Sequence, residues 1–133
     1  MSFQTVVPPA SKLALLTGEH QRGDEYRIAL YENAAPEGKY SPSGESGGQG
    51  YTPGGQVLGG YKAGLAGNVA YVSWTVSPKW ERASIKASEA IIYNVSKGGA
   101  VLMVLHFDDQ YTSKNGPFEV EFPASGVTGL LTL

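Results

Sequence analysis

Apolar and polar residues alternate along several short runs of the chain, with a period of two residues. The clearest run is Tyr26–Tyr31, and Val69–Val76 and Ser84–Tyr93 repeat the pattern. Because successive side chains of a β-strand point to opposite faces, each run is typical of a strand with one buried face. Val101–Leu105 is apolar at every position, which predicts a central strand covered on both sides.

The second half of the chain adds a hairpin and two further strands. Ser84–Tyr93 and Ala100–Phe107 are separated by a short glycine-containing link, so we expect them to pair as a hairpin. A polar loop is predicted over Asp108–Gly116. Phe118–Phe122 then alternates apolar and acidic residues, which indicates a half-buried strand with a solvated face. Val127–Leu133 is predicted to form the last strand.

The N-terminal region has a different character. Residues 1–10 are expected to form an extended arm, because Pro8 and Pro9 fix φ and lack an N–H donor. Ser11 is expected to cap a short helix that ends at Gly18. The arm has neither a basic nor an apolar segment of the kind found in secretory signals, so we expect no such signal.

Glycine and tyrosine are concentrated in one region, a predicted glycine-rich loop over residues 37–67. Residues 38–67 hold 11 of the 18 glycines, and Tyr51–Tyr61 is expected to be at most an irregular strand. Tyrosine is enriched at protein interfaces, so the loop and the arm supply the candidate interface residues, which are Pro8, Pro9, Tyr40, Tyr51, Pro53 and Tyr61. The alternative is that these rings fold back onto their own domain.

Taken together, the elements predict an all-β fold. We expect an antiparallel β-sandwich or a jelly-roll-like barrel, with a short N-terminal helix and an extended N-terminal arm. The 133 residues correspond to one domain, which we place at residues 11–133. Strands and helices do not alternate, which argues against a parallel-sheet enzyme fold.

Composition and charge exclude several classes of function. The chain has no cysteine, and its net charge is −2 with 10 basic and 12 acidic residues scattered along it. There is no basic stripe of the kind that binds phosphate backbones, so we expect no direct contact with nucleic acid. No run of apolar residues is long enough for a membrane span. We expect no cofactor and no metal.

One segment matches a catalytic motif by letter. Gly44–Gly48 reads G-E-S-G-G, which resembles the motif around a nucleophilic serine. A nucleophile elbow needs a strand before the serine and a helix after it, and both flanks here are typical of loops. The chain has only two histidines, His20 and His106, and we expect Ser46 to lie in a loop without a catalytic role.

The other candidate groups also have simpler interpretations. Glu119 and Glu121 face the same side of a strand, as a solvated acidic face would. His106 precedes Asp108 and Asp109, and a lone strand-end histidine beside a polar turn is expected there rather than a metal or catalytic site. We therefore predict that the chain is not an enzyme.

Five segments, taken in order, resemble a known group of proteins. The first two are Leu13–His20, which reads L-A-L-L-T-G-E-H, and Tyr26–Tyr31. The others are Gly50–Gly55, Ala90–Asn94 and Ser113–Phe118. This order, over residues 11–123, is similar to small structural proteins encoded among the virion genes of tailed bacteriophages.

The chain departs from the pattern of that group at three positions. Arg27 stands where the group usually has lysine, and Pro53 and Pro117 fall inside two of the motifs. No function is tied to these positions. The motifs themselves are structural and carry no catalytic signature.

The resemblance implies a virion component made in the host cytoplasm. The arm and the tyrosine-bearing loop favour a capsid decoration (cement) protein on the capsid surface, forming a homo-oligomer and binding the major capsid protein and copies of itself. Two alternatives stay open. One is a tail, neck or fibre-associated virion protein. The other is a carbohydrate-binding β-sandwich for host attachment, with Trp74, Trp80 and the loop tyrosines as contacts.

Overall fold

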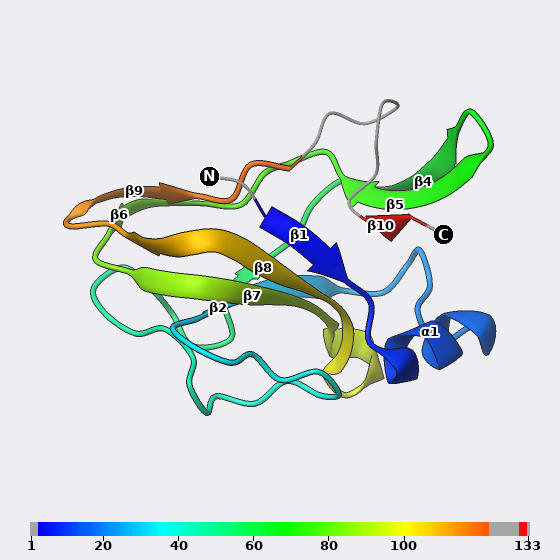
Figure 1. The fold of residues 1–133 in the computed structure, drawn as a ribbon, viewed down its shortest axis with the longest axis horizontal. Helices are drawn as coiled ribbons and strands as arrows, with labels where there is room; N and C mark the ends of the chain where they lie inside the picture. Colours follow the sequence, from blue (N-terminus) through cyan, green and yellow to red (C-terminus); the bar gives the residue numbers. More distant parts are fainter. Residues whose placement is uncertain (1–2, 123–130, 133) are drawn as a thin grey trace.

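The computed structural model describes residues 3–122 and 131–132, and these residues form a mostly β, antiparallel fold (Figure 1). The elements in chain order are β1 (Phe3–Val6), α1 (Pro9–Leu16), β2 (Tyr26–Tyr31), β3 (Gln56–Val57), β4 (Tyr61–Ala66), β5 (Val69–Trp74), β6 (Lys79–Ala83), β7 (Lys86–Asn94), the short 3-10 helix η1 (Val95–Lys97), β8 (Ala100–Thr112), β9 (Gly116–Glu119) and β10 (Leu131–Thr132). The all-β, sandwich-like class predicted from the sequence is confirmed.

The strands form three sheets. The largest has the order β1-β8-β7-β2-β3, and the smaller ones have the orders β10-β5-β4 and β6-β9. The predicted hairpin is the β7–β8 pair, linked by η1 and by Gly98 in the left-handed region at φ 68°. The β2–β7 pair keeps one register from Tyr26 opposite Asn94 to Tyr31 opposite Glu89.

The main hydrophobic core lies between the large sheet and the two small ones. Ile28, Leu105 and other residues of β2, β7 and β8 form one cluster with Trp74 of β5, Trp80 of β6 and Phe118 of β9. Burial of apolar area is the main favourable term in folding, so this layer holds the sheets together.

A second, smaller cluster covers the opposite face of the large sheet. It contains Ala29, Tyr31, Ile91, Tyr93, Val101 and Val104, and Ala35 and Tyr40 of the long loop after β2 pack against it. The prediction of a strand covered on both sides is confirmed, because Val101–Leu105 is buried at every position. The loop therefore acts as a third layer over the sheet.

The N-terminal region differs from the predictions in two ways. Residues 3–6 are extended, but they form edge strand β1, which pairs with β8 from Phe3 opposite Phe107 to Val6 opposite Val104. The helix starts at Pro9, and Pro8 is its N-cap residue. Proline fits the first helical position because the N–H it lacks has no partner there. Ser11 does not cap the helix. Its hydroxyl donates a hydrogen bond to the Val101 carbonyl and fastens α1 to β8.

Three strand predictions need correction or lie partly outside the described residues. β8 continues to Thr112, through half of the predicted polar loop. The irregular strand expected over Tyr51–Tyr61 is limited to the two residues of β3. The predicted loop over residues 37–67 is also too long, because Tyr61–Ala66 forms β4, which pairs with β5. Of the predicted last strand, Leu131–Thr132 is β10, and the remaining residues of Val127–Leu133 lie outside the described residues.

Candidate functional site

The serine of the G-E-S-G-G segment is a buried structural residue. Ser46 is 4% exposed. Its backbone N–H donates to the Leu30 carbonyl at 2.8 Å, and its hydroxyl donates to the Lys86 carbonyl at 2.7 Å. A nucleophilic serine needs an exposed oxygen bonded to a base. Neither condition is met, so this segment attaches the loop to the sheet.

The acidic residue of the same segment organises the loop. The Glu45 carboxylate accepts hydrogen bonds from the Tyr40 hydroxyl at 2.6 Å, the Tyr51 hydroxyl at 2.5 Å and the Gly54 N–H at 2.8 Å. The Gly54 carbonyl in turn accepts from the Tyr93 hydroxyl at 2.5 Å. We call these five residues the Glu45 network.

The pKa values of the tyrosine hydroxyls in this network are raised above their ordinary value. Burial raises the pKa of Tyr51 far above its ordinary value, and the hydrogen bond to Glu45 raises it further. Burial and the same carboxylate also raise the pKa of Tyr40. The hydroxyls of Tyr40 and Tyr51 therefore stay protonated across the physiological range and remain hydrogen-bond donors, which suits a structural role.

The six candidate interface residues divide into three groups. Tyr51 (8% exposed) and Pro8 are buried, so they offer no contact area to a partner. Tyr40 and Tyr61 are half-buried; Tyr40 stacks on Tyr93 with ring centroids 4.7 Å apart, and Tyr61 stacks on Tyr26 at 5.6 Å. Only Pro9 and Pro53 are exposed. All three tyrosine rings pack on their own domain, and Tyr40 and Tyr61 also keep some exposed area.

His106 is held by an acidic residue of the neighbouring strand. Its Nδ1 lies 2.7 Å from Glu89 Oε2, and Glu89 Oε1 accepts the Ala35 N–H at 2.7 Å. A surface hollow of about 490 Å³ lies beside it, lined by Phe3, Gln4, His106, Phe107 and Asp108. His106 and Glu89 thus form a hydrogen-bonded pair at the surface, on neighbouring strands β8 and β7.

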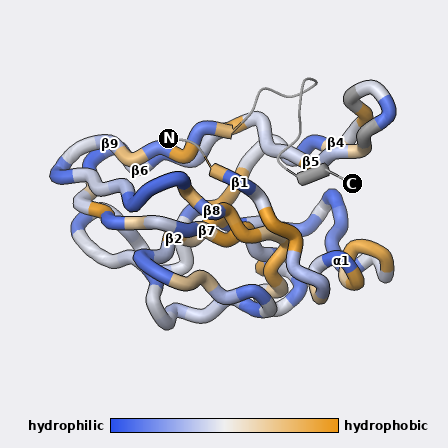
Figure 2. The backbone as a smooth tube through the Cα atoms, in the orientation of Figure 1, coloured by the Kyte–Doolittle hydropathy of each residue, from blue (hydrophilic) through white to orange (hydrophobic). Residues whose placement is uncertain are grey.

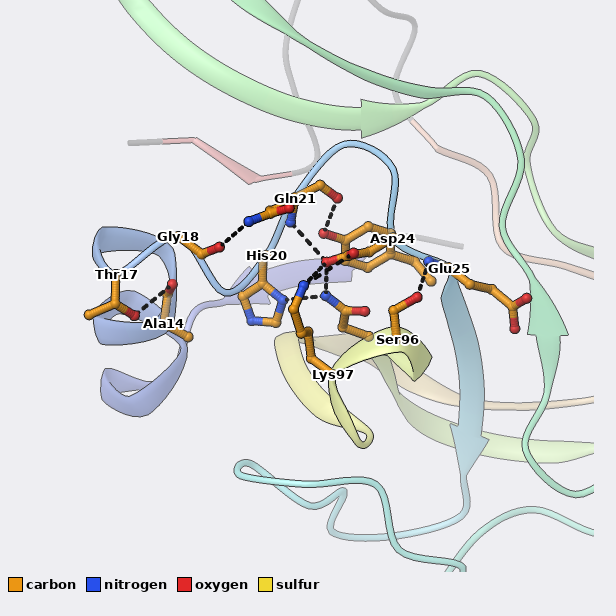
Figure 3. A network of polar contacts seen from close by, with 11 residues as sticks. Ala14, Thr17, Gly18, His20, Gln21, Asp24, Glu25, Ser96 and Lys97 are labelled. Atoms are coloured by element: carbon orange, nitrogen blue, oxygen red, sulfur yellow. Dashed lines mark hydrogen bonds and ion pairs between the residues drawn. The ribbon is translucent and has the colours of Figure 1, made fainter.

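A polar network around Asn94 joins the end of the helix to β7 (Figure 3). The fully buried Asn94 amide donates to Asp24 Oδ2 at 2.8 Å and lies 3.2 Å from His20 Nδ1. Lys97 Nζ lies 2.9 Å from Asp24 Oδ2. Burial lowers the pKa of His20, although Glu19 and Asp24 oppose this shift. His20 thus favours the neutral form and packs within this network.

Burial raises the pKa of the Asp24 carboxyl, but hydrogen bonds to the carboxylate together have a larger effect in the opposite direction. Hydrogen bonds from Asn94, Lys97 and Gln21 lower the pKa of Asp24 below its ordinary value. Asn94 and Asp24 are distinguished in the sequence only by their polar type beside apolar strands. Both are structural partners of His20.

The remaining candidate groups do not converge. Glu119 and Glu121 are exposed beside buried Phe118 and Phe122, as predicted. The predicted strand over Phe118–Phe122 is wrong in its bounds, because β9 spans Gly116–Glu119 and Glu121 lies beyond it. Within residues 3–122 and 131–132, no three His, Asp or Glu side chains are grouped as metal ligands. The described helices include none with the length and apolar character of a membrane span.

No protein-family model, curated protein or solved structure matches this chain. The candidate site must therefore be chosen from its own surface.

The three most exposed large apolar side chains of the described residues lie on α1 and β4. Leu16 and Leu13 of α1 are 87% and 62% exposed, and Leu65 of β4 is 70% exposed. Figure 2 shows the apolar stretch on α1 at the periphery of the fold. Ser11 and Ala14 occupy the buried side of the same helix. The helix is predictable from the sequence, but the side that faces outward is not, because the segment is apolar on most of its circumference.

Proposed function

We propose that this chain is a virion structural protein of a tailed bacteriophage, and that it decorates the capsid by binding between capsid subunits. The major capsid protein and further copies of the chain are its proposed partners, at the outer capsid surface. The five motifs over residues 11–123 support the virion assignment. The exposed side of α1 supports a role in protein binding.

The two leucines of α1 are the observation that carries this proposal. Ser11 and Ala14 fix the helix on β8, so Leu13 and Leu16 are presented outward on a supported element. Burying a leucine side chain contributes roughly 1.5–3 kcal/mol. A standard interface buries about 1,600 Å² in total, so α1 would form its apolar centre, and repetition over a symmetric shell would multiply the effect.

The internal use of the polar groups is consistent with this role. Ser46 and Glu45 hold the loop, and His20 and Asp24 hold the helix end. The carbohydrate-binding alternative loses its two tryptophan contacts, because Trp74 and Trp80 are 2% and 5% exposed and lie in the main core. Buried rings cannot stack on a sugar.

Binding to purified capsids that lack the protein tests the proposal. Wild-type protein should co-sediment with expanded capsids and raise their melting temperature. The double variant Leu13→Ser/Leu16→Ser should bind at least about 10-fold more weakly, since about 1.4 kcal/mol corresponds to a factor of ten. Val76→Ser is the matched control, because Val76 is also exposed (59%) but lies far along the chain from α1.

Two results would contradict the proposal. The first is absence of the protein from purified virions by mass spectrometry. The second is equal capsid binding by the α1 double variant and the Val76→Ser control. A gold-labelled copy found at the tail rather than the shell would assign the chain to the tail or neck alternative.

A further inference from the structure

The free edge of β4 is the least protected strand edge among the described residues. β1 spans four residues, and β3 and β10 span two each. The β6–β9 pair contains a register shift and several charged residues. β4 spans six residues (Tyr61–Ala66), contains one charged residue (Lys62), and pairs with β5 without a shift. Long, regular and nearly uncharged edges are those that recruit another strand.

Among the described strands, the sheet order leaves one edge of β4 without a neighbour. β4 is the last strand of the three-stranded sheet, and β5 is its neighbour on the paired side. The β4–β5 hairpin extends away from the large sheet (Figure 1). Natural proteins protect such edges with proline, bulges, several charges or a covering element. The described part of β4 has none of these beyond Lys62.

The hairpin turn determines which backbone groups face that edge. Gly67 and Asn68 form a two-residue turn, with Ala66 opposite Val69 and Gly67 at φ 62°. A β-turn joins the carbonyl of its first residue to the N–H of its fourth, so the Ala66/Val69 pair is a hydrogen-bonded pair.

Hydrogen-bonded and non-hydrogen-bonded pairs alternate along an antiparallel ladder. The Thr75 N–H donates to the Gly60 carbonyl at 2.9 Å, six residues from Ala66, which agrees with this alternation. Tyr61, Ala63 and Leu65 are therefore the residues whose N–H and C=O groups point away from β5.

We propose that two copies of this chain associate through β4, pairing the two edges antiparallel about a twofold axis at Ala63. In this register Ala63 faces the partner's Ala63, Tyr61 faces the partner's Leu65, and Lys62 faces the partner's Gly64. The three outward residues of each copy then form hydrogen-bonded pairs. The two three-stranded sheets become one continuous sheet, and the interface is isologous, as twofold symmetry requires.

The side chains of this register are compatible with the pairing. Tyr61 stacks on Tyr26 and contacts Trp74 edge-on, with centroids 5.6 and 5.7 Å away, so its ring is a fixed surface. The partner's Leu65 would lie opposite this ring on the same face. Aromatic and aliphatic cross-strand pairs stabilise sheets, and Leu65 is otherwise 70% exposed. Lysine faces glycine, so no like charges are opposed.

This inference deepens the proposed function, since it gives a surface for the self-association expected of a decoration protein. The dimer proposal can be contradicted without contradicting the virion assignment. Dimerisation is measured on the purified chain without capsids, whereas the virion assignment is tested by mass spectrometry and capsid binding through α1.

Site-directed disulfide formation tests the register, because the chain has no cysteine. In a hydrogen-bonded antiparallel pair the Cα atoms are about 5.5 Å apart, within the range that a disulfide spans. Ala63→Cys should therefore give a covalent dimer under mild oxidation. Leu65→Cys is the matched control on the same strand and face, and its two copies would be more than about 13 Å apart.

Sedimentation equilibrium tests whether the contact drives association. Ala63→Pro removes one outward N–H from each copy and leaves the ladder with β5 intact, because proline is tolerated at outward edge positions. Losing two hydrogen bonds should weaken dimerisation about 30-fold. Leu65→Lys, which places a charge opposite Tyr61, should also weaken dimerisation and serves as the second variant if the proline variant does not fold.

A concentration-dependent dimer that both variants weaken, together with selective cross-linking at residue 63, supports the proposal. A wild-type chain that stays monomeric at about 1 mM, where contacts weaker than about 4 kcal/mol escape detection, overturns it. A dimer that survives Ala63→Pro and Leu65→Lys, or equal cross-linking of both cysteine variants, also overturns it.

Discussion

Removing the Glu45 carboxylate should destabilise the domain by detaching the loop from the large sheet. The variant is Glu45→Ala. It leaves three donors without their acceptor, namely the hydroxyls of Tyr40 and Tyr51 and the N–H of Gly54. Tyr51 is buried and cannot turn to water, whereas Tyr40 is half-buried and can do so in part.

The magnitude follows from these three bonds. Hydrogen bonds to charged groups contribute about 1.5–3 kcal/mol each. The lower value for all three gives about 4.5 kcal/mol, and partial hydration of Tyr40 reduces this to about 3 kcal/mol. For a chain of this size that loss should lower Tm by about 10 °C. It is a large fraction of the roughly 5–15 kcal/mol that holds a typical domain folded.

Urea unfolding followed by tryptophan fluorescence is a suitable assay, because Trp74 and Trp80 are buried in the main core. Glu37→Ala is the matched control, since Glu37 is an exposed acid in the same loop. Its effect should stay within about 0.5 kcal/mol. Equal free energies of unfolding for the Glu45 and Glu37 variants would refute the argument that the carboxylate organises the loop.

Three further predictions concern stability. Burial lowers the pKa of His20 in the folded state. The contribution of His20 to stability should therefore be complete above the unfolded pKa of about 6.5 and fall as pH drops below it. The difference between the urea midpoints at about pH 7.5 and 5.5 should be smaller in His20→Gln than in the wild type. Ser46→Ala should lower the free energy of urea unfolding by about 1 kcal/mol through its lost hydrogen bond to the Lys86 carbonyl, and a variant as stable as the wild type would contradict this structural role. Gly55→Ala should lower the free energy of urea unfolding by about 2 kcal/mol or more beyond the loss caused by Gly18→Ala. Both glycines have φ near +78°, but only at Gly55 would the new Cβ meet a backbone atom, the Ile28 carbonyl oxygen at 1.7 Å. Similar costs would disprove the close approach.

The strands with a clear period of two residues were predictable from the sequence. Tyr26–Tyr31 matches β2 at both ends, because alternation and the flanking polar residues limit the strand on each side. The end of β8 was not predictable in this way. Asp108–Gln110 is polar on both faces, yet the strand resumes pairing with β7 at Tyr111 opposite Ala87. Long-range pairing there outweighs local composition.

The polar networks could not be predicted, because they join residues far apart in the chain. Asn94 contacts His20 and Asp24 across 74 and 70 positions. Glu45 gave a weak local signal, as a single acid among glycines near several tyrosines. The G-E-S-G-G segment drew attention to Ser46, although the carboxylate beside it makes more contacts.

The glycine and tyrosine content of residues 37–67 has an internal explanation. A loop that covers a sheet face needs glycine where its backbone crosses a strand, as Gly48 does at the Ser84 carbonyl and Gly55 at the Ile28 carbonyl. It also needs long side chains with polar tips to reach buried partners, which Tyr51 provides. An interface loop would have the same composition, so composition does not separate the two uses. Exposed large apolar side chains distinguish an interface from an internal packing loop better than composition does. Leu13 and Leu16 on α1 and Leu65 on β4 are the most exposed of these among the described residues.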